Sequence, residues 1–66
     1  MPRFLVYESS CQTNELTKYT VCASSLRAVQ VIANTRQMFS REHSYIRIRD
    51  SKHKSLASKI YGRWFK

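Results

Sequence analysis

The spacing of apolar and polar residues predicts two strands near the start of the chain. Residues 3–8 (RFLVYE) are rich in β-branched and aromatic side chains, a composition typical of a strand. In residues 17–23, apolar side chains such as Tyr19 and Val21 alternate with polar ones, which indicates a second strand. The polar segment between the two runs contains Asn14, a residue suited to a turn. We therefore expect an antiparallel hairpin.

The middle of the chain has the period of an amphipathic helix. Ser24 and Ser25 offer a hydroxyl that can accept from the free amides of a first turn, so they predict the helix start. From about residue 25 to residue 39, apolar side chains recur at steps of three and four. The apolar side carries Ala28, Val29, Ile32, Ala33 and Phe39. The polar side carries Arg27, Gln30, Asn34, Gln37 and Arg41, with Val31 and Met38 beside it.

Residues 44–50 alternate without interruption and predict a half-buried strand. Ile46 and Ile48 take one face, and the opposite face carries Tyr45, Arg47 and Arg49. The polar residues that follow form a charged turn, which includes Lys52, His53 and Lys54.

Residues 56–65 fit either a helix or a strand. Leu56, Ile60 and Trp64 are four residues apart, as in a helix, but all three positions are even-numbered, as on one face of a strand. We favour the strand, because it would pair with residues 44–50 and hide an edge of that strand, and because Gly62 weakens a helix. This strand would place Lys59, Tyr61 and Arg63 on the face opposite the apolar residues.

Together these elements predict a single α+β domain over residues 1–66. The element order is ββαββ, with the helix covering one face of a four-stranded antiparallel sheet. A chain of this length buries only about 60% of its unfolded surface, so a deep catalytic pocket is hard to build. No apolar run approaches the roughly 20 residues of a membrane helix, and the run at residues 4–7 is too short for a secretory leader. We expect a cytoplasmic protein, as a monomer or as a small homo-oligomer paired through an exposed sheet edge.

Metal binding and catalysis have weak support in the sequence. The predicted hairpin separates Cys11 from Cys22 too widely for a disulfide. A zinc site formed by these cysteines with His43 and His53 is the alternative, but the ligands lack the close pairs of zinc fingers, and we expect no metal or cofactor. The chain has no glycine-rich phosphate loop and no nucleophile motif, so we expect no enzyme. A small ribonuclease toxin, with His43, His53 or Glu42 as the base and an arginine stabilising charge, is the third-ranked hypothesis.

The charge distribution points to an acidic partner. The net charge is +8, and residues 34–66 carry +7 of it. Like charges repel across a compact surface, so this excess contributes nothing to stability. On paired C-terminal strands, basic residues interleaved with aromatic rings would suit a polyanion, although a solvated outer face is an equally good interpretation. The residues predicted to bind a partner or nucleic acid are Arg27, Arg36, Tyr45, Arg47, Arg49, Lys52, Lys54, Lys59, Tyr61 and Arg63.

The helix and its flanks resemble one group of small phage proteins. The serine-capped Leu-x-Ala start in residues 23–28 (ASSLRA), the Gln-x-Phe end in residues 37–39 and the strand hairpin that follows are similar to ββαββ anti-CRISPR proteins, which inhibit type I surveillance complexes. The resemblance implies a non-enzymatic inhibitor that docks on a host ribonucleoprotein complex in the bacterial cytoplasm and also makes non-specific DNA contacts. It assigns Arg27, Arg36 and neighbouring basic residues to that contact. The basic charge excludes mimicry of DNA. The alternative hypothesis is a stand-alone regulator that binds DNA or RNA.

Overall fold

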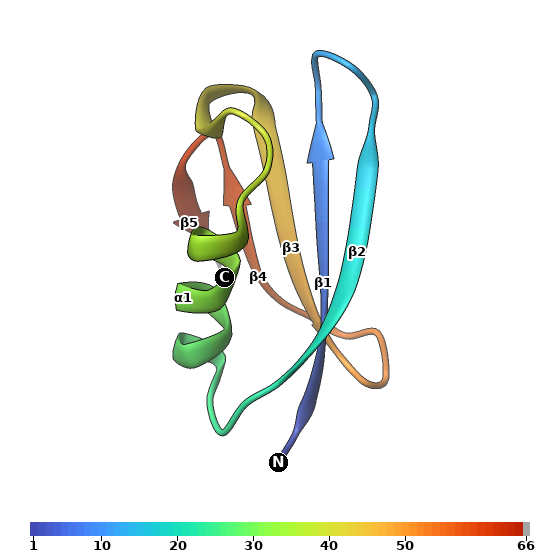
Figure 1. The fold of residues 1–66 in the computed structure, drawn as a ribbon. Coiled ribbons are helices and arrows are strands. Elements are labelled where there is room, and N and C mark those ends of the chain that lie inside the picture. Colours follow the sequence, from blue (N-terminus) through green and yellow to red (C-terminus); the bar gives the residue numbers. More distant parts are fainter. Residues whose placement is uncertain (66) are drawn as a thin grey trace.

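Five antiparallel strands form one sheet, and a single helix lies across one of its faces (Figure 1). The computed structural model describes residues 1–65. The elements are β1 (Arg3–Ser10), β2 (Leu16–Cys22), α1 (Leu26–Arg36), the short 3-10 helix η1 (Arg41–His43), β3 (Ser44–Asp50), β4 (Ser55–Ile60) and β5 (Arg63–Phe65). The strand order is β2-β1-β3-β4-β5. The α+β class and the single helix are confirmed, and the sheet has five strands where the sequence predicted four.

The β1–β2 hairpin forms as predicted. Its register pairs Arg3 with Cys22, and its connecting loop contains Asn14 in a left-handed conformation with φ of 59°. Cys11 lies in this loop, at the opposite end of the hairpin from Cys22, and both thiols are free. The separation of the two cysteines therefore follows from the strand register.

The helix begins where the sequence predicts and ends earlier than expected. The Ser25 hydroxyl accepts a hydrogen bond from the Ala28 N–H at 3.2 Å, which caps the first turn. The helix ends at Arg36, although the apolar period extends to residue 39. A side chain from β1 explains this difference, because the Glu8 carboxylate accepts the N–H groups of residues 38 and 39 at 3.0–3.1 Å. These two N–H groups are bound to the sheet and cannot continue the helix.

The core lies between α1 and the face of the sheet that the helix covers. Val29 and Ala33 of the helix are fully buried, as their spacing predicts, and so are Ile46 and Ile48 of β3. Leu56 and Trp64 pack against the edge of this cluster. The opposite face of the sheet has no element over it in residues 1–65, and Figure 1 shows α1 on one side only.

Residues 56–65 form two strands with a tight turn between them. The prediction of a strand over a helix is confirmed, but the prediction of one continuous strand is wrong. Tyr61 and Gly62 connect β4 to β5 with φ of 50° and 86°, and Ile60 pairs with Arg63 across the turn. Two central residues with positive φ are typical of the type I′ hairpin turn, whose twist matches that of the strands.

Lys59 occupies the face opposite to the one the sequence predicts. It pairs with Ile46 and points toward α1, whereas Ile60 pairs with Tyr45 and points away from it. Lys59 is 7% exposed, so its predicted place on the exposed face of the sheet is wrong. The ammonium donates to Asn34 Oδ1 at 2.6 Å and Gln37 Oε1 at 3.1 Å.

These partners explain why a lysine is stable in this position. Nζ also lies 5.8 Å from the centre of the Trp64 ring, which adds a cation–π contact. Burial lowers the pKa of Lys59, and the nearby Arg41 lowers it further. The side-chain amide oxygens of Asn34 and Gln37 supply the acceptors that a buried cation requires, and the aliphatic stem of the lysine packs as an apolar group.

Candidate nucleic-acid interface

We call the sheet surface that points away from α1 the open face. Directly paired residues of antiparallel strands project to the same side, so the register assigns its members. Three rows cross the sheet, one starting at each of three β2 residues. The first row is Lys18, Tyr7, Arg47, Ser58 and Phe65; the second is Leu16, Ser9, Tyr45, Ile60 and Arg63; the third is Thr20, Leu5, Arg49 and Ser55.

Basic side chains occupy the open face, and within the described strands no acidic side chain shares it. The basic members are Arg3, Lys18, Arg47, Arg49 and Arg63. Glu8 points to the opposite side, where it is 1% exposed. Glu15 and Glu42 lie outside the strands. The open face is thus a surface of one charge sign, which raises the local concentration of anionic ligands.

The fourth acidic residue, Asp50, stabilises the turn between β3 and β4. Its carboxylate accepts the N–H groups of Lys52 at 2.8 Å and Lys54 at 2.9 Å. The Lys54 and Lys52 N–H groups hold the pKa of Asp50 below its ordinary value, with a smaller effect from the charges of the two lysines. Both lysine side chains are exposed in this turn, as predicted.

Aromatic rings accompany the cations. The Arg49 guanidinium carbon lies 5.6 Å from the centre of the Tyr7 ring, and its Nε is shielded without an acceptor among residues 1–65. At the other end of the face, the Tyr45 and Tyr61 rings lie 5.5 Å apart and their hydroxyls share a hydrogen bond of 3.1 Å. This hydrogen bond to Tyr45 is the main cause that raises the pKa of Tyr61 to about 12. The rings are therefore held in place by neighbours on the same surface.

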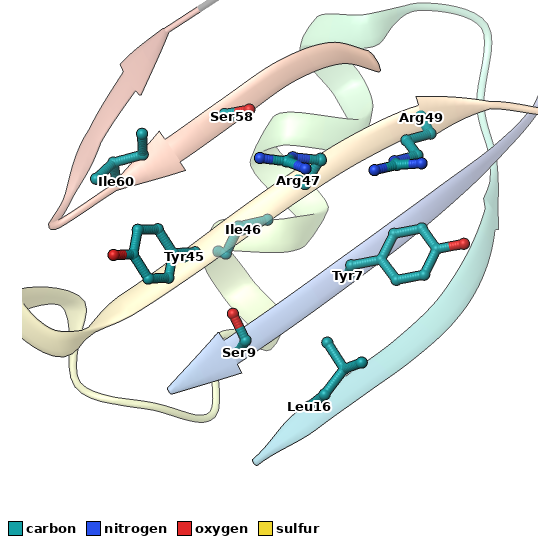
Figure 2. Close-up of a pocket in the computed structure, with 9 residues that line it drawn as sticks. All are labelled: Tyr7, Ser9, Leu16, Tyr45, Ile46, Arg47, Arg49, Ser58 and Ile60. Carbon is teal, nitrogen blue, oxygen red and sulfur yellow. The ribbon is translucent and has the colours of Figure 1, made fainter. Parts of the chain in front are cut away.

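A hollow of about 420 Å³ lies on the open face (Figure 2). Its lining residues are Tyr7, Ser9, Leu16, Tyr45, Ile46, Arg47, Arg49, Ser58 and Ile60. Figure 2 shows Tyr7 and Tyr45 at opposite ends of it, with Arg47 of β3 between them and Arg49 beside the Tyr7 ring. The hollow exists because Ser9 is small and stands between Leu16 and Tyr45 in its row. A second hollow of about 350 Å³ lies across Tyr7, toward Lys18 and His53.

The predicted binding residues divide between the two sides of the molecule. Tyr45, Arg47 and Arg49 lie together on the open face, as the alternation of residues 44–50 predicts, and Arg63 reaches it from β5. Tyr61 borders this face from the turn. Arg27 and Arg36 lie on α1, on the other side of the sheet, where Arg36 stacks 4.7 Å from the Tyr19 ring centre. The structure therefore does not join the helix arginines to the open face.

Sequence reasoning missed the contribution of β1. Tyr7 and Ser9 are central to the open face because β1 pairs with β3, at a distance of more than 35 residues along the chain. The alternation of residues 17–23 places Lys18 on a polar face, and this was the one indication in the sequence that the N-terminal hairpin contributes to the open face. Only the pairing of β1 with both β2 and β3 shows that Lys18 and Arg47 lie on the same face of the sheet.

The candidate metal ligands and catalytic groups lie at two ends of the sheet. Cys11 and His43 are adjacent at one end, where the Cys11 N–H donates to the His43 carbonyl at 2.9 Å. Cys22 and His53 lie toward the other end, since Cys22 pairs with Arg3 and the His53 N–H donates to the Asp50 carbonyl. Within residues 1–65, no three His, Cys, Asp or Glu side chains cluster as a metal site would require. The two histidines are likewise too far apart to act on one substrate bond.

Comparisons of the chain with protein-family models, curated proteins and solved structures found no match. Among residues 1–65, no helix has the length and apolar character needed to cross a membrane. The chemistry of the open face is therefore the basis for a functional assignment.

Proposed function

We propose that the protein binds single-stranded nucleic acid on its open face and does not catalyse a reaction. The observation that supports this most directly is the central row of the sheet, where Lys18 and Arg47 pair with Tyr7 on either side of β1. Cations in such a row neutralise phosphates, and the ring offers a stacking surface to a base. The lack of acidic side chains among the described residues of this face removes the repulsion that a polyanion would otherwise meet.

The shape of the open face favours a single strand over a duplex. The major groove of a duplex admits a helix or a two-stranded ribbon, and a five-stranded sheet is too wide to enter it. Bases in a duplex are also stacked on one another, so tyrosine rings reach base faces only where a strand is unpaired. Two hollows on either side of Tyr7 give successive bases room along such a strand.

This binding would operate in the setting that the sequence suggests. The bound strand would belong to a host ribonucleoprotein complex in the bacterial cytoplasm, and occupation of that strand would inhibit the complex, as the resemblance to anti-CRISPR proteins implies. A stand-alone regulator would use the same face on free RNA or DNA. The two roles differ in whether protein subunits add to the affinity.

Fluorescence anisotropy with labelled 12-nucleotide strands tests the proposal. The expected result is binding that falls about 50-fold between 50 and 200 mM NaCl, since about four phosphate contacts on a single strand give that salt dependence. The double variant Lys18→Glu/Arg47→Glu should lose more than tenfold in affinity. Arg27→Glu/Arg36→Glu is the matched control, because it makes the same charge change on α1, away from the open face. Circular dichroism verifies that each variant folds.

Two outcomes would overturn the proposal. One is the absence of binding by the wild-type protein at 50 mM NaCl, and the other is an equal loss of affinity in Arg27→Glu/Arg36→Glu. A pull-down from bacterial lysate with nuclease treatment then separates the two roles. Discrete subunits that remain after nuclease support the inhibitor, whereas recovery of nucleic acid alone supports the regulator.

A further inference from the structure

We infer that the hollow between Tyr7 and Tyr45 selects guanine: one guanine of the bound strand enters it and accepts two hydrogen bonds from Arg47. This inference rests on the proposed function, because the base belongs to a strand held on the open face. It goes beyond that function by assigning sequence preference to one site and to one side chain.

The walls of the hollow suit the flat face of a base. Its volume of about 420 Å³ lies within the range of about 300–1,000 Å³ that is typical of small-molecule sites. Tyr7 and Tyr45 border the hollow at opposite ends with their rings pointing away from each other, so a base stacks on one ring rather than between the two, and Leu16 and Ile60 add apolar surface (Figure 2). A phosphate gains no binding free energy from apolar side chains, whereas a base stacks on tyrosine with a favourable free energy.

The polar groups at the hollow are mainly hydrogen-bond donors. Arg47 and Arg49 contribute guanidinium groups, and the only other side-chain polar groups in the lining besides the two tyrosine hydroxyls are the hydroxyls of Ser9 and Ser58. Among the described residues, none that lines the hollow carries a carboxylate or an amide side chain. A base that binds here must therefore present acceptors rather than donors to the arginine wall.

Guanine meets this requirement best among the four bases. Its O6 and N7 are adjacent acceptors that match the two parallel N–H groups of a guanidinium, which is the commonest specific contact between arginine and a base. Adenine presents the N6 donor beside N7, so one arginine N–H would face another donor. Uracil has a donor beside its carbonyl groups. Cytosine has two acceptors on its pairing edge but has a single ring, which covers less of a tyrosine than a purine does.

The two arginines have different surroundings and hence different roles. Arg49 packs over the Tyr7 ring, with its guanidinium carbon 5.6 Å from the ring centre, and forms part of the wall. Arg47 is exposed and lies between Tyr45 and Arg49 along β3 (Figure 2). Arg47 therefore reads the base edge. The Arg49 Nε is shielded and has no acceptor among residues 1–65. A small rotation of the Arg49 side chain would let this N–H donate to an oxygen of the bound strand.

The test compares single strands that differ at one base. The probes are labelled 12-nucleotide RNAs of uridine with G, A, C or U at the centre, measured by anisotropy at one salt concentration. The expected result is about tenfold tighter binding of the G strand, because one bidentate pair discriminates by that order. Replacement of that G by 7-deazaguanine, which lacks the N7 acceptor, should remove most of the preference.

Variants of the protein separate base selection from charge. Arg47→Lys keeps the positive charge but lacks the planar fork, so it should bind all four strands about equally while the salt dependence persists. Ser9→Phe should fill the hollow and give the same result. Thr20→Phe is its matched control, because Thr20 lies on the open face outside the lining of this hollow and should leave the preference for guanine intact. If Ser9→Phe does not fold, Arg47→Lys carries the test alone.

The outcomes distinguish this inference from the proposed function. Equal, salt-sensitive affinities for the four strands would overturn guanine selection and leave nucleic-acid binding in place. Retention of the preference with 7-deazaguanine or in Arg47→Lys would also overturn it. Absence of binding to any strand would overturn both.

Discussion

Lys59 is a buried cation that depends on polar side chains of α1 and of the residue that follows it. Its ammonium has acceptors on Asn34 and Gln37, and Glu8 lies in the same row of the sheet, beyond Ile46. A carboxylate at position 59 would lose both hydrogen bonds and would share a buried layer with the carboxylate of Glu8.

We therefore predict that Lys59→Glu lowers the free energy of unfolding by about 3 kcal/mol. Arg47→Glu makes the same charge change at an exposed position and should shift it by no more than about 0.5 kcal/mol. Urea denaturation followed by the fluorescence of Trp64, which packs near Lys59, measures both values. Similar effects of the two substitutions would show that Lys59 is not buried.

Because of Asp50, the free energy of unfolding should decrease at acid pH. Hydrogen bonds from Lys54 and Lys52 lower the pKa of Asp50 in the folded state. An acid whose folded pKa is depressed contributes stability that is complete above its unfolded pKa of about 3.9 and is lost as pH falls through the folded pKa.

The variant Asp50→Asn should therefore lose less stability than the wild type as pH falls from 5 to 2, since an amide has no proton to gain. Urea denaturation at half-unit pH steps tests this prediction. Glu15→Gln, in the β1–β2 loop, is the control and should follow the wild-type curve. Parallel curves for Asp50→Asn and the wild type would contradict the assignment.

At the scale of the element, the start of α1 depends on one hydroxyl. Ser25 accepts from the Ala28 N–H, whereas the neighbouring Ser24 is exposed, and among residues 1–65 no side-chain partner for it is present. We predict that Ser25→Ala lowers the free energy of unfolding by about 1 kcal/mol and that Ser24→Ala changes it by less than half as much. Thermal denaturation followed by circular dichroism measures the difference. A larger effect of Ser24→Ala than of Ser25→Ala would show that Ser24, not Ser25, caps the helix.

The elements differ in how far the sequence alone predicts them. The strand at residues 44–50 was predictable because its alternation is local and matches one buried face. The end of α1 was not, since it is set by Glu8, a residue 30 positions away from the N–H groups it accepts. The faces of β4 were not predictable either, because Lys59 is buried through partners on α1 and the apolar Ile60 is left on the open face.

The candidate interface was likewise predictable only in part, where its residues follow a local pattern. Its β3 half, with Tyr45, Arg47 and Arg49, follows from the alternation of one strand. Its β1 half, with Tyr7 and Ser9, requires the pairing of strands that are distant in the chain. The hollow belongs to neither half alone, because it forms where Ser9 of β1 stands beside Tyr45 of β3.

At the scale of the whole molecule, unbalanced charge should make stability depend on salt. The net charge is +8 on a body of 34 × 19 × 17 Å. At 0.01 M salt the screening length is about 30 Å, so cations across the whole molecule repel one another, and at 0.15 M it is about 8 Å.

We predict that the midpoint of thermal unfolding rises by several degrees from 10 to 150 mM NaCl, as about 1 kcal/mol of relieved repulsion shifts it by about 4–8 °C in a domain of this size. The double variant Lys18→Gln/Arg47→Gln should rise less. A midpoint that falls over this range would show that attractive ion pairs dominate.

The restriction of the helix to one side of the sheet also bears on how this protein can evolve. Residues that hold the chain together, such as Val6, Ile48 and Val29, lie between the sheet and α1. Tyr7 and Arg47 share strands with them but point the other way. If the open face binds nucleic acid as proposed, mutations on it would alter what is recognised while the fold is preserved, and a new preference could arise by a single substitution. Descendants of this chain would then keep their interiors and diverge across the open face.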